Sequence, residues 1–533
     1  MKTWNSFHSR RLIQGFVGAG ILASLFFVAA SGYATTLYWD TNGSAPGSGN
    51  AGGNWNMKTT RTIIITIISA FLLGLGGAQL TPALAADLTL KAMDGFDTSS
   101  FTSPLTGAAA GWGPSGLAPT NGNNYLTGTY TLRSPTGSGS YTFPGASLSI
   151  DAGGNFYLKG NATGMTLTIT NLILNGGAIL QNVGSINSQT TLNGTNISLS
   201  ATSSLCAQTN ESLTVNAKIT GGASAGLNIG QSGSVYTGDV KLNNYKNDYT
   251  GTTRIQSGTL YVWQSNVIPD ASAVVIDTGA ILSFTNGGGR SDTIGSLAGS
   301  GSVLMKASDF DPIVLACGGD NSSTEFSGSL VGGITSRVGR FLKQGTGVLT
   351  LSGTNNTYND KTIVSNGTLR VTGKHTGGNN YIVAPGATLG GTGTITLAAT
   401  TNNVRLIGSD AAHRAKLAPG VSGAGTLTIS NGAGGTNVVF DAYSELAVSL
   451  TGDTVTKLAC GAMDLGGATD YLTINVTGMR TRSRYVFATY TGSLAGNIFD
   501  QVTVTGVSNG KIDYSIPGEI AIIIVRGTLI TLF

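Results

Sequence analysis

Two stretches of the sequence repeat one pattern, and this repeat constrains the fold more than any other feature. YTGTTRIQSGTLYV begins at Tyr249, and YNDKTIVSNGTLRV begins at Tyr358. In both, the tyrosine precedes a glycine, Gly258 or Gly367, by nine positions, and that glycine opens Gly-Thr-Leu-x-Val. Shorter forms of the unit are GVLTLSG at 347–353, GATLGGTGTI at 386–395 and GTLTI at 425–429. Each unit predicts a turn glycine followed by a short strand.

The alternation within each unit predicts a strand with one buried face. In GTLYV, Leu260 and Val262 share a face and Tyr261 lies on the other, and GTLRV alternates in the same way. One such strand cannot bury its apolar face alone, whereas coils stacked at about 4.8 Å build one continuous core. We therefore predict an all-β fold, a right-handed parallel β-helix or solenoid, preceded by irregular or helical signal segments. A β-sandwich or barrel is the alternative, but so long a region without helical breaks would require several of them.

The composition agrees with many short strands and tight turns. The 533 residues include 80 glycines, and 10% of them are charged, against about 25% charged residues and about 7% glycine in ordinary soluble domains. The glycines follow no Gly-X-Y period, so the composition does not indicate collagen. The 40% hydrophobic content is enough to build a core, which excludes a disordered chain.

The basic net charge comes from the N-terminal segments. Residues 1–85 contain five basic residues and one acid, so 24 basic and 24 acidic residues remain from Ala86 onward. A neutral region has no excess of cations to neutralise a phosphate backbone. We therefore expect no nucleic-acid partner.

A second export signal begins inside the sequence. MKTTRTIIITIISAFLLGLGG starts at Met57, with Lys58 and Arg61 before an apolar run and Ala-Leu-Ala at 83–85. This is the plan of a secretory signal peptide, with a basic region, an apolar region and a small-residue cleavage site. We expect 57–85 to be a signal peptide and the true start of the precursor.

The alternative is a membrane helix over 62–80 that stays in place after an earlier cleavage. The apolar run Ile63–Gly77 is shorter than the roughly 20 residues that a span needs. The Ala-Leu-Ala site also favours removal. We therefore expect no stable membrane span after signal cleavage, and a mature chain that begins at Ala86.

Another signal peptide occupies residues 1–34. Arg10 and Arg11 precede an apolar stretch, and Gly32-Tyr33-Ala34 offers a cleavage site. The stub at 35–56, TTLYWDTNGSAPGSGNAGGNWN, then ends at Met57. We interpret 35–56 as a truncated N-terminal segment, and residues 1–56 as a fused fragment of a neighbouring, related gene.

The three cysteines indicate no disulfide framework and no metal site. Cys206, Cys317 and Cys460 lie far apart in the chain, without metal-ligand spacing. We expect small buried hydrophobic side chains, with one long-range disulfide as the alternative.

The repeat resembles a known family. Residues 341–373, FLKQGTGVLTLSGTNNTYNDKTIVSNGTLRVTG, resemble the autotransporter-associated β-strand repeat, whose form is close to K-x-G-x-G-x-L-T-L-S-G, N-x-Y and G-T-L-x-V. A second copy is suggested at 247–262. The sequence departs from the family at Asp360, where the pattern has the glycine matched by Gly251, so we expect that corner to be built differently. The stub at 35–56 resembles the opening of mature proteins of this family.

The resemblance sets the expected domain organisation. It is specific over about 240–480 and weaker before, so we expect an N-terminal solenoid at 86–240, the repeat region at 241–480 and C-terminal strands or a cap at 481–533. It implies an exported passenger or stalk of the β-helix type, without enzymatic activity, and it supplies no catalytic residues.

Few residues beyond position 85 could carry catalysis. The two histidines are His375, in GKHTGG, which we interpret as a turn, and His413, in DAAHRAK, which we interpret as an irregular charged loop. Neither lies in a recognisable triad or metal motif.

Acidic pairs and exposed aromatics are the other candidates. Asp94/Asp97 and Asp309/Asp311 could serve as general acid and base or as calcium ligands; we favour ordinary surface turns. Trp263 and Tyr261 could stack on sugar rings, but structural packing is the simpler interpretation. A cleft with three or more converging acids and a Lys or Arg would favour catalysis.

We therefore predict a secreted or cell-surface β-solenoid with a structural or adhesive role, not an enzyme, with no catalytic, cofactor or metal residues and no cofactor. Surface glycans or other cell-surface proteins are the expected partners. The alternative is a carbohydrate-active β-helix enzyme, a polysaccharide lyase or hydrolase.

Overall fold

The structure is a computed structural model that describes residues 85–92, 101, 111–113, 118–182, 187–233, 235–284, 289–306, 312–333, 339–431, 435–496 and 498–525. The chain divides into two compact units, 1–83 and 84–533. Every described residue belongs to the second unit. The expected signal segments and stub, apart from Ala85, therefore lie outside the described residues.

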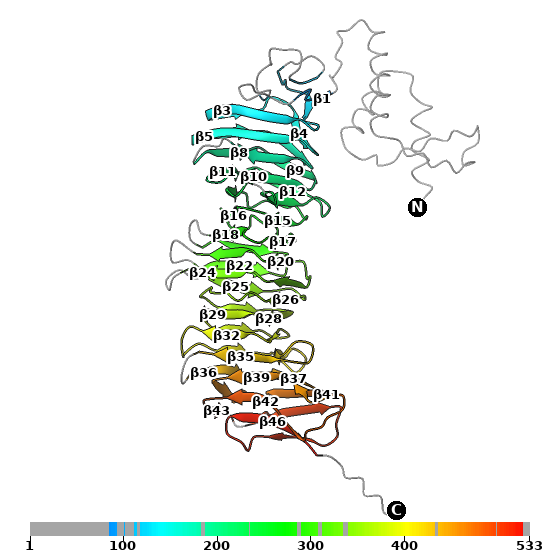
Figure 1. Cartoon of the computed structure of the whole chain (residues 1–533), viewed down its shortest axis with the longest axis vertical. Helices are drawn as coiled ribbons and strands as arrows, with labels where there is room; N and C mark the ends of the chain where they lie inside the picture. Colours follow the sequence, from blue (N-terminus) through cyan, green and yellow to red (C-terminus); the bar gives the residue numbers. More distant parts are fainter. Residues whose placement is uncertain are drawn as a thin grey trace, which may run out of the picture. The chain divides into compact units, whose positions relative to one another are not determined.

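The described residues form 46 strands and contain no helix. Nearly all strand pairs are parallel and join one coil of the chain to the next, and Figure 1 shows the coils following one another in chain order from β3 to β46. The predicted all-β parallel solenoid is confirmed, and its right-handed sense stays a prediction. The described part holds no helix long and apolar enough to cross a membrane.

The strands form ladders, one above the other. The first ladder is β7 (Ala178–Gln181), β10 (Ser203–Ala207), β13 (Leu227–Ile229), β15 (Thr253–Ile255), β17 (Ala273–Ile276), β20 (Ser296–Gly299), β23 (Thr324–Phe326), β26 (Val348–Leu351), β28 (Thr368–Val371), β31 (Thr388–Gly391), β34 (Ala415–Pro419), β37 (Ser444–Thr451), β41 (Tyr471–Thr477) and β44 (Gln501–Thr505). The second ladder is β8 (Gln189–Asn193), β11 (Ser212–Val215), β14 (Asp239–Leu242), β16 (Thr259–Val262), β18 (Ile281–Ser283), β21 (Ser302–Met305) and β24 (Ser329–Gly332). The long strands β3 (Thr131–Thr142) and β5 (Asn155–Thr168) join the two ladders into one sheet, to which β38 (Thr454–Val455) also belongs.

Three smaller sheets complete the coils. One is β1 (Asp87–Thr89), β2 (Asn124–Leu126), β4 (Ser147–Asp151), β6 (Asn171–Asn175), β9 (Asn196–Ala201) and β12 (Lys218–Gly221). The next is β19 (Ser291–Ile294), β22 (Ile313–Cys317), β25 (Gly339–Lys343), β27 (Thr362–Val364), β30 (Tyr381–Val383), β33 (Val404–Leu406), β36 (Thr436–Phe440), β40 (Ala462–Asp464) and β43 (Leu494–Ala495). The last is β29 (Lys374–Gly378), β32 (Thr394–Leu397), β35 (Thr426–Ser430), β39 (Lys457–Cys460), β42 (Arg484–Tyr490), β46 (Glu519–Ile524) and β45 (Gly510–Asp513).

The repeated residues have equivalent places in the core. Tyr249 and Tyr358 are fully buried, and the hydroxyl of each lies 2.8 Å from the hydroxyl of the threonine four residues later. Leu260 and Val262 point into the core, while Tyr261 is half-buried. Pairing the buried phenol with a threonine satisfies its polar end inside an apolar stack. The predicted inward and outward faces are thus confirmed.

Glycine makes the predicted corners. Gly258 and Gly367 have φ of +71° and +61°, the left-handed region that side chains disfavour. A Cβ at either residue would lie 2.4 Å from a backbone oxygen of the preceding coil. At Asp360, the position matched by Gly251, the carboxylate is bonded at 2.8 Å to Arg340, and the expected difference in how the two corners are built stays a prediction.

Asparagines on successive coils form a hydrogen-bonded stack at the outside of the core. Asn216 donates to the amide oxygen of Asn193 at 2.8 Å, and Asn243 donates to that of Asn216 at 2.9 Å. Asn193 ends β8, Asn216 directly follows β11 and Asn243 directly follows β14. The three asparagines therefore occupy one position on three successive coils. Because each side-chain amide both donates and accepts, identical residues in register extend the hydrogen bonding of the sheet.

The C-terminal end changes to antiparallel pairing. β46 lies between β42 and β45 and is antiparallel to both. Arg484 of β42 is bonded to Asp513 at 2.8 Å and to Glu519 at 2.7 Å. The last coils of this sheet are therefore closed by a reversed strand. The domain boundaries expected at 240 and 480 stay predictions.

Candidate functional site

A polar groove of about 450 Å³ crosses the coils of β8, β11 and β14. The three strands are stacked in parallel register, which aligns Gln189, Ser212 and Asp239 along the outside of the ladder. Turn residues just before the strands, including Thr209 and Thr237, complete the lining. The groove therefore exists only because residues from three coils are brought side by side.

Hydroxyl, amide and charged groups line the groove. The hydroxyls of Thr209 and Thr237 are 2.6 Å apart and join two coils. The charged residues of the described lining are Glu211, Asp239 and Lys241. Glu211 is 3% exposed, whereas Asp239 and Lys241 are half-buried. A catalytic cleft on this fold is expected to hold three or more converging acids, and the described lining of this groove holds two.

Asp239 is the half-buried carboxylate of the groove. Burial raises the pKa of Asp239 above its usual value, and the attraction of Lys241 opposes that rise. Within the described residues, no donor is hydrogen-bonded to this carboxylate. It is an acceptor that a ligand hydroxyl could reach.

Trp263 lies on the next coil along the solenoid. The ammonium of Lys241 is 5.1 Å from the centroid of its ring, and the guanidinium of Arg290 is 5.6 Å away. Tyr261 pairs in register with Lys241. The indole thus contacts two cations, which agrees with the packing interpretation of Trp263, while the packing interpretation of Tyr261 stays a prediction.

The sequence pointed to none of the groove residues. They come from positions 187 to 241, and no local motif joins them. One signal was present: an apolar residue followed by asparagine recurs at 192–193, 215–216 and 242–243. Aligning these pairs would have placed the three coils in register.

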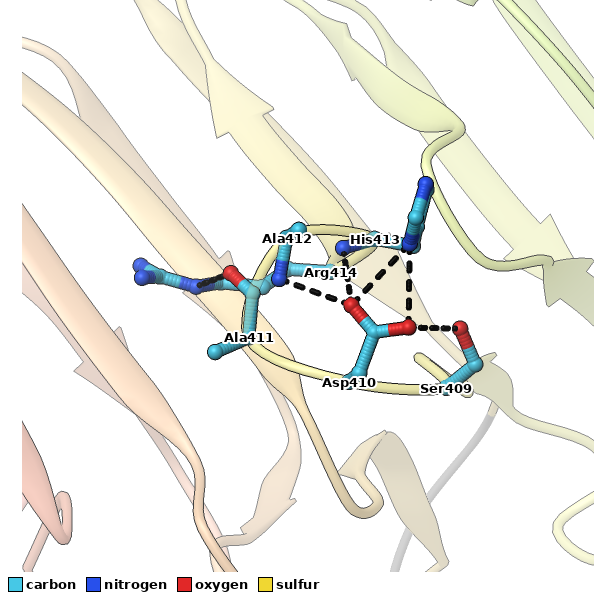
Figure 2. Close-up of polar contacts among 6 residues, drawn as sticks. All are labelled: Ser409, Asp410, Ala411, Ala412, His413 and Arg414. Atoms are coloured by element: carbon cyan, nitrogen blue, oxygen red, sulfur yellow. Dashed lines mark hydrogen bonds and ion pairs between the residues drawn. The ribbon is translucent and has the colours of Figure 1, made fainter.

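His413 lies in the irregular charged loop that the sequence predicted (Figure 2). Its Nδ1 and its backbone N–H lie 2.9 Å from the Asp410 carboxylate, and the backbone N–H of Ala412 donates to the same group at 2.8 Å. The bond from His413 and these backbone donors lower the pKa of Asp410. The hydroxyl of Ser409 also donates to the carboxylate, at 3.1 Å. Serine therefore contacts the acid instead of the imidazole, which differs from a nucleophile–base pair.

His375 is in a strand, so its interpretation as a turn residue was wrong. It lies in β29, is 1% exposed and stacks on Tyr358 with ring centroids 4.0 Å apart. Its Nε2 donates to the carbonyl of Tyr358 at 2.9 Å, and its Nδ1 accepts from the hydroxyl of Tyr381 at 2.6 Å, because a carbonyl can only accept. Burial lowers the pKa of His375 to about 4. This neutral imidazole is a core residue.

The cysteines are free and buried, as the sequence predicted. Burial raises the pKa of each thiol to about 12. Such thiols are poor nucleophiles and poor metal ligands.

The acidic pairs Asp94/Asp97 and Asp309/Asp311 lie outside the described residues. Within the described ranges, no group of three or more His, Cys, Asp or Glu side chains could hold a metal ion.

The sequence is similar to a family of passenger repeats and to a bacterial adhesin autotransporter. Residues 236–262 and 341–371 match the family Passenger-associated-transport-repeat. Over 299 residues the chain is 27% identical to the adhesin BmaC autotransporter of Brucella suis biovar 1 (strain 1330), a match that covers 55% of this chain and 8% of the adhesin. Both repeat matches coincide with coils whose tyrosine and glycine have equivalent places in the core.

Proposed function

We propose that this chain, a protein with autotransporter passenger repeats, is the β-solenoid of a secreted or cell-surface protein and has a structural or adhesive role without catalysis. The observation that carries the proposal is the coincidence of the repeats with a continuous parallel solenoid. The similarity to an adhesin supports the adhesive role. The match covers only 8% of that relative. We therefore propose the partners of this chain from its own surface.

The fold suits a display element. Each coil buries its apolar face against its neighbours, so the outward side chains can vary without loss of the core. Outward Thr, Asn, Ser and charged residues on the described coils offer a polar surface. Such a surface can hold partners away from a cell or contact them directly.

Surface labelling and adhesion test this proposal. We expect antibodies against residues 86–533 to label intact cells that express the full chain, and those cells to adhere to glycan-coated surfaces or host cells more than cells without the gene. Labelling only after permeabilisation, or equal adhesion of both cell types, would contradict the proposal.

The polar groove keeps the alternative of a carbohydrate-active enzyme open to experiment. Incubation of the purified chain with a panel of neutral and acidic polysaccharides, followed by assays for reducing ends and unsaturated products, separates the two functions. We expect no product. Product formation that is lost in Asp239→Ala would favour the enzyme.

A further inference from the structure

The groove on β8, β11 and β14 has a lining that selects for a particular ligand chemistry. Its side chains are hydroxyls, amides, two carboxylates and one amine. Among the described lining residues there is no large apolar side chain. The described lining therefore favours polar ligand groups over the apolar anchors that dominate peptide and protein recognition.

Strand addition is also excluded at this place. β11 is paired with β8 on one side and with β14 on the other, and β14 is paired further with β16. The backbone hydrogen-bonding groups of these strands are already used in the ladder. An extended peptide that recognises a free sheet edge has no edge here.

The charge of the lining disfavours polyanions. The described lining holds two acids, Glu211 and Asp239, and one amine, Lys241, whose ammonium already contacts the Trp263 ring. Nucleic acids and sulfated polysaccharides require a surplus of cations. A neutral ligand meets no such repulsion.

Neutral carbohydrate hydroxyls match the groups that are left. Each sugar hydroxyl donates and accepts, as do the paired hydroxyls of Thr209 and Thr237. The Asp239 carboxylate, half-buried and without a hydrogen-bond donor among the described residues, can accept from two neighbouring sugar hydroxyls. The coils repeat at about 4.8 Å, a spacing comparable to the length of one pyranose unit.

We propose that this groove binds a neutral oligosaccharide laid along the solenoid axis across the coils of β8, β11 and β14. The inference rests on the proposed adhesive role and names its ligand class. Asp239 accepts hydrogen bonds from the sugar, and Thr209 and Thr237 bond to it at the adjoining turn. Lys241 supplies the positive charge of the groove, and its ammonium contacts the Trp263 ring.

Calorimetry on the full chain tests the groove. The probes are linear neutral oligosaccharides of glucose, mannose or N-acetylglucosamine, with alginate and heparin as acidic probes. We expect at least one neutral probe to bind, and Asp239→Ala or the double variant Thr209→Val/Thr237→Val to weaken that binding about tenfold or more. Thr278→Val is the matched control, because Thr278 forms the same kind of intercoil hydroxyl pair, 2.7 Å from Ser300. Its affinity should equal that of the wild type.

Two outcomes would overturn the inference. One is binding of the acidic probes alone, and the other is equal binding by the groove variants and the wild type when all have wild-type circular dichroism and thermal midpoints. Adhesion assays separate this failure from failure of the proposed function. Cells that adhere equally with Asp239→Ala and with the wild-type chain would keep the adhesive role and reject the groove, whereas wild-type cells that do not adhere would reject the adhesive role itself.

Discussion

His375 illustrates how a single polar residue is accommodated in the core of a solenoid. Its two ring nitrogens are bonded to Tyr381 and to the carbonyl of Tyr358, and its ring stacks on the Tyr358 ring. Both hydrogen bonds suit the neutral imidazole, since a second N–H at Nδ1 would face a hydroxyl that now donates to it. The environment therefore opposes protonation through burial and through hydrogen-bond geometry.

This residue predicts a loss of stability in acid. The folded pKa of about 4 lies below the ordinary value of 6.5, so the unfolded chain takes up a proton at a higher pH than the folded one. Its contribution is complete above pH 6.5 and is lost as the pH falls toward 4, by about 3 kcal/mol in all. Urea unfolding at pH 7 and pH 4.5 measures the difference.

A comparison of variants isolates His375 from other titrating groups. His375→Gln should destabilise the chain at pH 7 but show a smaller further loss between pH 7 and pH 4.5 than the wild type. The exposed His413 provides the control, and His413→Gln should follow the wild-type profile. Equal acid losses in His375→Gln and the wild type would contradict the assigned role.

At the scale of one element, the glycine corners show two separate costs of replacing glycine: the cost of a left-handed backbone and the cost of a steric clash. Gly258 and Gly279 both have positive φ, +71° and +82°. A Cβ at Gly258 would lie 2.4 Å from the carbonyl oxygen of Gly238, whereas nothing lies within 4 Å of a Cβ at Gly279. The first corner needs glycine for conformation and for space, and the second needs it for conformation alone.

Alanine substitutions should therefore differ in their effects. Gly279→Ala should lower the free energy of unfolding by about 1–2 kcal/mol, the cost of the left-handed conformation. Gly258→Ala should cost several kcal/mol more, because the rigid backbone of the preceding coil must move. Thermal and urea unfolding of both variants measure this, and equal losses would show that the coils can separate without strain.

At the scale of the whole molecule, stability is a sum over neighbouring coils. β46 is the central strand of the closing antiparallel group, between β42 and β45. Ile522 of β46 is fully buried and pairs with Tyr485 on one side and Ile512 on the other. Loss of β46 would remove the strand that pairs with β42 and protects the last coils.

Ile522→Pro should unfold the C-terminal coils first. Proline removes a ladder hydrogen bond and is tolerated poorly in a central strand. We expect hydrogen-exchange protection in β39 and β42 to fall about tenfold or more, while protection in β16 stays unchanged. A uniform loss of protection across all coils would instead indicate one cooperative unit.

The sequence by itself determined the parts of the fold that repeat locally. The nine-residue spacing from Tyr249 to Gly258 and from Tyr358 to Gly367 predicted equivalent coils, and the alternation of Leu260, Tyr261 and Val262 predicted the buried face. These features depend on backbone conformation and on a period of two, which neighbouring residues specify.

Only the tertiary structure decided what depends on residues from different coils. The pairing of the His375 strand with β32, the ion pair of Asp360 with Arg340, the antiparallel end and the polar groove each join residues about twenty or more positions apart. Coil lengths vary along the chain, so the register between one coil and the next is set by packing in three dimensions. For this reason the sequence predicted a solenoid, whereas the surface that could recognise a partner became visible only when the coils were stacked.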